Sequence, residues 1–318
     1  MESSGQSLSA IITCFNTGEL LLAALRSVQL SMATPGNCRC EIVVVDDAST
    51  DATTLTILDD IVRTHPAIRM VRQPINRGVS AARNRGAMEA TGAWLAFLDG
   101  DDLWLGDRVA LLFQVLRAAP QAAWISSDYQ RMSLEGERFG TSAIRHPQIA
   151  FFFEGSAVAE VATLGKPIEA ALSSFLCHVN STLIKRQTFF EVAGFDEQLR
   201  SAEDHDLWIR LAFITDLVYI PVCSSLYRVN PNSLTNTKRQ PFPRLASVYR
   251  KTLRSPSARP FESVIRKRIS DLEDQNIVFF RRNGKFLQAI TCSLRLLRSQ
   301  PSSMRGWKHL IASILKRR

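Results

Sequence analysis

The chain lacks a long apolar run, and this absence argues against a membrane-spanning helix. No uninterrupted apolar stretch in its 318 residues approaches the roughly 18 residues that a helix needs to span a bilayer. The first nine residues are polar and contain no signal-peptide core. We therefore expect a cytoplasmic protein without a membrane-spanning helix.

Paired cysteines, internal repeats and low-complexity tracts are also missing. The six cysteines are scattered, and Cys38 and Cys40 have no second pair at the spacing of a zinc site. Reduced thiols are the expectation for such a set. With 46% hydrophobic and 22% charged residues, the chain can form a substantial core, so disorder is not the expectation.

Acidic residues are scarce in the last part of the chain. Residues 238–318 hold 20 Lys+Arg and 4 Asp+Glu, a charge of +16, whereas residues 1–237 hold 19 and 26, a charge of −7. An acidic first part is a poor general binder of polyanions, so a phosphate ligand there would need a metal ion as intermediary. We therefore expect a first domain at 1–237 and a basic helical region at 238–318.

Short apolar runs alternate with helical patterns through the first 132 residues. The pattern predicts strands and helices at 8–14, 20–28, 41–45, 51–65, 68–72, 79–90, 93–98, 103–118 and 122–132. Such alternation implies an α/β fold with parallel pairing and right-handed crossovers. Ligands of open parallel sheets bind beyond the carboxyl ends of the strands. The polar loops expected to converge there are 13–16, 46–47, 76–78 and 99–102.

The alternation ends after residue 133. The remaining pattern predicts a loop or hairpin at 135–147, a strand at 178–185, a turn at 194–197, a helix at 202–212, a strand at 219–227, a linker at 231–243 and then basic helices. Residues 151–166 fit no pattern clearly.

The stretch at 94–104 carries the strongest chemical signal. Its apolar part leads to Asp99, Asp101 and Asp102 on a glycine-containing turn. Like charges this close repel each other, and hard carboxylate oxygens suit Mg²⁺ or Mn²⁺, which also binds phosphate. The cluster therefore predicts a metal-bridged diphosphate. The alternative is an acidic turn that caps a helix from Leu103.

Three other loop residues each have a functional and a structural interpretation. Phe15 is suited to stack on a nucleobase, with Thr13 at the edge of the base, or belongs to the core. Asp47 is suited to accept from a base or ribose, or caps a helix. Arg83 lies in a run of small residues and is suited to meet a phosphate or Asp99, or lies on the surface.

The helix predicted at 202–212 begins with two carboxylates. Glu203 and Asp204 supply a candidate general base, although acidic residues in a first turn are also favoured by the helix dipole. His178 and His205 are taken as structural, because no metal-ligand spacing joins them.

Six segments occur in a recognisable order along the chain. They are IITCFN at 11–16, VVVDDASTDAT at 43–53, NRGVSAARNRG at 76–86, FLDGDD at 97–102, GFDE at 194–197 and EDHDLWIRLA at 203–212. Together they resemble glycosyltransferase family 2, the inverting enzymes of the GT-A fold. The resemblance covers about residues 8–230. It implies a Rossmann-like, mixed but mostly parallel sheet flanked by helices, with a nucleotide-sugar half at about 8–132 and an acceptor half at about 133–230.

The resemblance also implies an activity. A sugar is expected to pass from a nucleotide diphosphate sugar, with a UDP-sugar as the expected donor, to a hydroxyl of a glycan or lipid-linked acceptor. Because no membrane span is predicted, we expect a single addition, in cell-surface polysaccharide or lipopolysaccharide biosynthesis. The sugar, the acceptor and the oligomeric state stay open.

Site residues follow from the same resemblance. It implies that the nucleotide-sugar is bound by Thr13, Phe15, Asn16, Asp47, Gly78, Arg83 and Asp99. Asp101 is the expected ligand of Mn²⁺ or Mg²⁺, and Asp204 the expected catalytic base. Glu203 and Trp208 are expected to support the acceptor or its loop. Many relatives carry proline where this chain has Thr13, a departure that should affect the loop more than the chemistry.

The basic tail lies outside the resemblance and carries two apolar helical faces. These consist of Phe286, Ile290, Leu294 and Leu297, and of Trp307, Leu310, Ile311, Ile314 and Leu315. Basic amphipathic helices of this kind bind anionic membrane surfaces, so residues 285–318 predict peripheral membrane binding. The alternative is a helical appendage that packs on the catalytic domain and keeps a solvated basic face.

Two other protein classes are weaker interpretations. A haloacid-dehalogenase-like phosphatase also has Asp-x-Asp after a strand, but it would leave the preceding loops unexplained. A protein that binds nucleic acid or another anionic surface through the tail is the second. The tail has no recognised nucleic-acid motif, so no nucleic-acid partner is expected.

Overall fold

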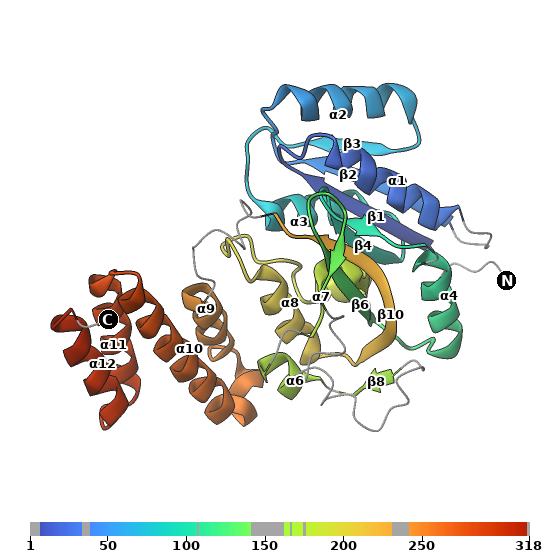
Figure 1. Cartoon of the computed structure of the whole chain (residues 1–318). Helices are drawn as coiled ribbons and strands as arrows, with labels where there is room; N and C mark the ends of the chain where they lie inside the picture. Colours follow the sequence, from blue (N-terminus) through green and yellow to red (C-terminus); the bar gives the residue numbers. More distant parts are fainter. Residues whose placement is uncertain are drawn as a thin grey trace. The chain divides into compact units, whose positions relative to one another are not determined.

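The chain forms two compact units, Met1–Asn230 and Pro231–Arg318. The structure is a computed structural model and describes residues 7–33, 39–106, 108–140, 162–165, 167–173, 176–230 and 242–316 (Figure 1). Within these ranges, no helix combines the length and the apolar character that crossing a bilayer requires. The five cysteines that the structure describes are free thiols.

Within the described residues, a ten-stranded sheet organises the first unit. Its strands are β1 (Ser7–Cys14), β2 (Arg39–Asp46), β3 (Arg69–Arg72), β4 (Trp94–Asp99), β5 (Leu103–Trp104), β6 (Trp124–Met132), β7 (Arg138–Phe139), β8 (Ala162–Leu164), β9 (Thr182–Lys185) and β10 (Leu217–Arg228). The order is β3-β2-β1-β4-β9-β6-β10-β5, and β7 and β8 pair with β6 and β10 outside this path. β1 to β4 are parallel, β6 is parallel to β10, and β9 is antiparallel to both of its neighbours. The predicted mixed, mostly parallel sheet is therefore confirmed.

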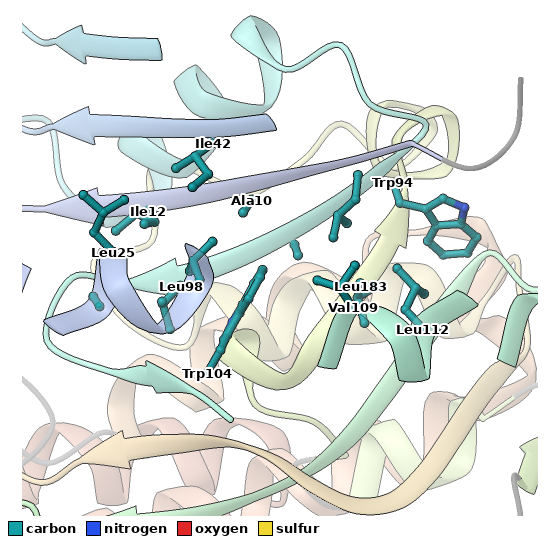
Figure 2. Close-up of a cluster of buried hydrophobic side chains, with 14 of the residues drawn as sticks. Ala10, Ile12, Leu25, Ile42, Trp94, Leu98, Trp104, Val109, Leu112 and Leu183 are labelled. Carbon is teal, nitrogen blue, oxygen red and sulfur yellow. The ribbon is translucent and has the colours of Figure 1, made fainter. Parts of the chain in front are cut away.

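Helices cover both faces of this sheet. They are α1 (Leu20–Met32), α2 (Ala52–Thr64), α3 (Val79–Glu89), α4 (Arg108–Ala118), α6 (Ile168–Ser173), α7 (Arg186–Glu191) and α8 (Glu203–Ala212). One face packs against α1, α2 and α4 in an extensive apolar cluster, part of which Figure 2 shows around Ile12, Leu98 and Trp104. On the other face, Phe97 contacts Phe189 of α7, and Trp124 stacks on Trp208 of α8.

The helix α3 lies close to the second face because its inner residues are small. Ser80, Ala81, Ala82 and Ala87 are buried, and Gly86 lies directly on β1. A Cβ atom at Gly86 would lie only 2.3 Å from Cγ2 of Ile11. The small-residue run therefore brings the start of α3 to the carboxyl ends of the strands.

Two predicted elements differ from the structure. The predicted helix at 103–118 begins only at Arg108, because Leu103 and Trp104 form β5 and pair antiparallel with β10. The predicted strand at 178–185 begins as the 3₁₀ turn η3 (Val179–Ser181), and only Thr182–Lys185 forms β9. The first difference arises from pairing with a distant strand. In the second, the turn is closed by a hydrogen bond from the backbone N of Ser181 to the carbonyl of His178 at 3.0 Å.

The second unit is helical, as predicted. Its elements are α9 (Phe242–Thr252), the 3₁₀ turn η4 (Pro256–Phe261), α10 (Glu262–Arg282), α11 (Phe286–Ser299) and α12 (Met304–Ile314). Ile277 of α10 packs with Ala289, Cys292 and Leu296 of α11 in a small core. The predicted linker lies mostly outside the described residues.

The predicted apolar faces of this unit are only partly buried. On α11, Leu297 is buried but Leu294 is 53% exposed. On α12, Leu310 is buried, whereas the other members of the predicted face are exposed. Periodicity thus identified the helices but not which side of each faces the core.

Candidate active site

The four predicted polar loops converge at the carboxyl ends of the parallel strands. The carbonyl of Thr13 accepts from the backbone N of Gly100 at 2.8 Å, and the carbonyl of Cys14 accepts from the backbone N of Asp47 at 2.9 Å. The Asp47 side chain in turn accepts from the backbone N of Gly78 at 2.8 Å. The loops after β1, β2, β3 and β4 are therefore joined to one another.

Asn16 fixes the loop that follows β1. Its backbone is left-handed, with φ at 53°, and its Oδ1 accepts from the backbone N atoms of Thr50 at 2.8 Å and Asp51 at 3.2 Å. Phe15, the residue before Asn16, is 45% exposed, while Thr13 is 6% exposed. The interpretation of Phe15 as a core residue is therefore wrong, and its ring is open to a ligand.

The carboxylate of Asp47 holds the loop before α3. Its Oδ1 accepts from Nε2 of Gln73 at 2.6 Å and from the backbone N of Arg77 at 2.8 Å. Gly78, which follows, has φ at 90°, a conformation that favours glycine. Asp51, not Asp47, caps α2, so the helix-cap interpretation of Asp47 is wrong. Asp47 therefore organises the loop before α3.

Arg83 joins the two acidic motifs. Its Nη2 lies 2.7 Å from Oδ1 of Asp99, and its Nη1 lies 2.9 Å from Oε1 of Glu203. The side chain is only 3% exposed and its guanidinium lies over the ring of Phe195. Burial alone would lower the pKa of Arg83, but the carboxylates of Asp99 and Glu203 raise it. The interpretation of Arg83 as a surface residue is therefore wrong.

The GFDE segment is a turn that docks on α3. Asn84 accepts from the backbone N of Phe195 at 2.9 Å and donates to its carbonyl at 2.8 Å. Arg77 forms an ion pair with Glu197 at 2.7 Å. These contacts place the Phe195 ring beneath Arg83. They also join the GFDE turn to α3, the helix that contains the run of small residues.

The acidic turn after β4 brings carboxylates of different exposure together. Asp99 and Asp101 are partly exposed, while Asp102 is buried. Burial, and after it the charge of Asp99, raises the pKa of Asp101 to about 6. A cation would relieve this repulsion. Within the described part of the chain no three His, Cys, Asp or Glu side chains form a metal site by themselves. The carboxylates of Asp99 and Asp101 are hard oxygen ligands of the kind that suits Mn²⁺ or Mg²⁺, ions that take one or two protein carboxylates and share their other positions with phosphate and water.

Asn180 and Arg228 stabilise this turn, and sequence patterns did not identify either residue. Asp102 accepts from the backbone N of Arg228 at 2.5 Å and from Nδ2 of Asn180. Oδ1 of Asn180 accepts from the backbone N of Asp99 at 3.1 Å, and Nε of Arg228 donates to the carbonyl of Asp101 at 2.8 Å. The interpretation of the acidic turn as a helix cap is therefore wrong.

Replacing Asn180 with alanine is expected to destabilise the first unit by about 1–3 kcal/mol, because a buried carboxylate and a backbone N–H of the turn lose their partner. Asn180 is 0% exposed. Urea unfolding measures the change. Asn283→Ala is the control, since this exposed amide donates to the carbonyl of Phe279. Equal unfolding midpoints for the two variants would contradict the role of Asn180.

Asp204 lies in the first turn of α8, close enough to the other acids to interact with them. Burial, followed by the charge of Glu203, raises the pKa of Asp204 to about 7, although Arg83 lowers it. Glu203 is paired with Arg83. Of the two neighbouring carboxylates, Glu203 and Asp204, it is therefore Asp204 that is suited to accept a proton near neutral pH.

Trp208 and the two histidines have structural surroundings. Trp208 is fully buried, and its Nε1 donates to the carbonyl of Cys177 at 3.2 Å. His178 packs between Tyr129 and Tyr227, and burial lowers its pKa to about 4. His205 is 1% exposed.

Known proteins are similar to this chain in sequence. Residues 9–160 match Glycosyl transferase family 2. An uncharacterized glycosyltransferase of Haemophilus influenzae is 27% identical over 205 residues, which cover 64% of this chain and 61% of the relative. The succinoglycan biosynthesis protein ExoO of Rhizobium meliloti is 33% identical over 129 residues, 40% of this chain and 34% of ExoO. The chain thus spans less than two thirds of the length of these relatives.

Solved structures share the fold. TarS 1–349 of S. aureus in complex with UDP-GlcNAc has a TM-score of 0.64 at 16% identity, over 98% of this chain and 88% of TarS 1–349. The mannosyltransferase PcManGT of Pyrobaculum calidifontis, in complex with GDP-Man and Mn²⁺, has a TM-score of 0.58 at 19% identity, over 97% of this chain and 86% of PcManGT. The GT-A fold is confirmed, and these similarities support the assignment of the chain to glycosyltransferase family 2.

Proposed function

We propose that the protein transfers a sugar from a nucleotide diphosphate sugar to a hydroxyl group, with inversion at the anomeric carbon. The observation that carries this proposal is the bridge made by Arg83, which joins Asp99 of the acidic turn to Glu203 beside Asp204. A donor site and a general base are thereby held together at the carboxyl ends of the strands, where ligands of open α/β sheets bind.

The proposed donor is a UDP-sugar, in line with the UDP-GlcNAc bound to TarS, although PcManGT binds GDP-Man. The exposed ring of Phe15 is suited to stack on the base. The loop fixed by Asp47 would approach the ribose and phosphates through Gly78. The full proposed donor site consists of Thr13, Phe15, Asn16, Asp47, Gly78, Arg83 and Asp99.

In the proposed reaction Asp204 removes the proton of the acceptor hydroxyl. The acceptor oxygen then forms a bond with the anomeric carbon, while the bond from that carbon to the diphosphate oxygen breaks and the nucleoside diphosphate leaves. Asp101, with Asp99, would hold Mn²⁺ or Mg²⁺. When bound, the ion supplies positive charge that stabilises the departing diphosphate. The turn that carries both carboxylates is held by Asn180 and Arg228.

The proposed acceptor is a glycan or a lipid-linked glycan of a cell-surface polysaccharide or lipopolysaccharide. The similarity to ExoO, a protein named for succinoglycan biosynthesis, supports a polysaccharide product. We further propose that each encounter adds one sugar, and that the protein is located at the cytoplasmic face of a membrane.

The test is an assay of nucleoside diphosphate release. The protein is incubated with UDP-, GDP-, dTDP- and CDP-sugars, Mn²⁺ and an extract of lipid-linked glycans. One donor class should be consumed, and mass spectrometry should show products larger by a single sugar. Absence of release with every donor would contradict the proposed activity, and long polymers formed in one encounter would contradict single addition.

A further inference from the structure

The helix α12 has apolar residues on two sides. Its inner side, with Gly306, Leu310 and Ser313, is buried. The outer side carries four large apolar residues at a spacing of three or four positions, which places them on one face of the helix. They are Met304 at 73%, Trp307 at 50%, Ile311 at 55% and Ile314 at 58% exposure.

This outer stripe is held in a fixed position. A Cβ atom at Gly306 would lie 2.8 Å from Cδ2 of Leu297, so the inner side of α12 packs directly on α11. Nε1 of Trp307 donates to the carbonyl of Pro301 at 3.0 Å, which fixes the indole at the start of the helix. Single exposed apolar residues are ordinary on protein surfaces, but a contiguous stripe indicates a binding surface.

Basic residues predominate in the described part of the second unit, and three of its four acids form ion pairs. Residues 242–316 contain 16 Lys+Arg and 4 Asp+Glu, a charge of +12. Glu262 is paired with Arg266, Glu273 with Arg250, and Asp274 with Arg305 and His309. Lys308, beside Trp307, and Lys316, just beyond the helix, are exposed. The partner of this surface is therefore expected to be both apolar and anionic.

We propose that the outer face of α12 binds the surface of an anionic lipid bilayer. The stripe of Met304, Trp307, Ile311 and Ile314 enters the boundary between headgroups and acyl chains, where tryptophan is favoured. Lys308 and Lys316 lie at the level of the headgroup phosphates. This surface is narrower than the segment 285–318 predicted from sequence, because Leu297 and part of α11 face the core of the unit.

The proposed binding of α12 to a bilayer is separate from the proposed sugar transfer and does not depend on it. Vesicle sedimentation of the full chain tests it, with neutral phosphatidylcholine vesicles and with vesicles that also contain phosphatidylglycerol. The wild type should sediment with the anionic vesicles only, and less at high salt. Ile311→Glu should weaken this binding at least ten-fold. Val62→Glu is the matched control, since Val62 of α2 is also 55% exposed, and it should bind like the wild type.

Several results would overturn the proposal. They are failure of the wild type to bind anionic vesicles, equal binding by Ile311→Glu, and an equal loss in Val62→Glu. Light scattering after size exclusion tests self-association. If the wild type is a dimer that does not bind vesicles, and Ile311→Glu is a monomer, the stripe binds a second copy of the chain and the proposal is wrong. Circular dichroism verifies folding. The thermal shift caused by the nucleotide-sugar should be unchanged in Ile311→Glu, which separates this result from a failure of the proposed function.

Discussion

Replacing Asp204 with asparagine is expected to lower turnover by about 100-fold or more, while the affinity for the nucleotide-sugar stays unchanged. The amide keeps the size of the side chain but cannot accept the proton of the acceptor hydroxyl. Initial rates at saturating donor and acceptor measure the loss, and calorimetry measures donor affinity. Asp60→Asn, which removes an exposed carboxylate of α2, is the control. Unchanged turnover in Asp204→Asn would remove this residue from the role of base.

The pH dependence of the wild type follows from the same residue. Burial raises the pKa of Asp204 to about 7, and a general base works only when deprotonated, so turnover should fall as pH decreases through about 7. The sign for stability is opposite. Because the folded state holds this proton more tightly than the unfolded chain does, the contribution of Asp204 to stability should decrease as pH rises from about 4 to about 7. A turnover profile that is flat between pH 5 and 8 would contradict the assignment.

Replacing Arg83 with methionine is expected to destabilise the first unit by about 3–5 kcal/mol, because two carboxylates with little exposure lose their partner. The side chains of Asp99 and Glu203 are 26% and 12% exposed. Urea unfolding measures the change, and donor binding should be lost with it. Arg85→Met, on the same helix, breaks a pair with Glu89 in which the arginine is 48% exposed. That control should cost less than about 1 kcal/mol. Similar values for the two variants would contradict the bridging role of Arg83.

Local patterns predicted most of the first half of the sheet. The strands from β1 to β4 and the helices between them follow from apolar periodicity, because each is a complete element within a short segment. Leu103 and Trp104 show the limit. Their sequence is compatible with the start of a helix, but they pair with Leu226 and Ser225 of β10. A contact so distant along the chain leaves no local signal.

In the candidate site, too, local motifs were predictable and contacts distant along the chain were not. Residues in compact motifs, such as Asp101 and Asp204, were predicted from the sequence, and their catalytic roles stay predictions. Asn180 and Arg228 were missed, because they act on Asp102 from 78 and 126 positions away. The motifs therefore identified the groups suited to the chemistry, while the structure was needed to identify the residues that hold those groups in place.

Binding of the donor together with the metal is the central claim. A thermal-shift panel of UDP-, GDP-, dTDP- and CDP-sugars, with and without Mn²⁺, tests it on the wild type and on Asp101→Ala. A ligand that binds only the folded state raises the melting temperature. One donor class should raise that temperature only when Mn²⁺ is present, and the rise should be lost in Asp101→Ala. Absence of a shift with every nucleotide-sugar, or an equal shift in Asp101→Ala, would contradict the proposed site.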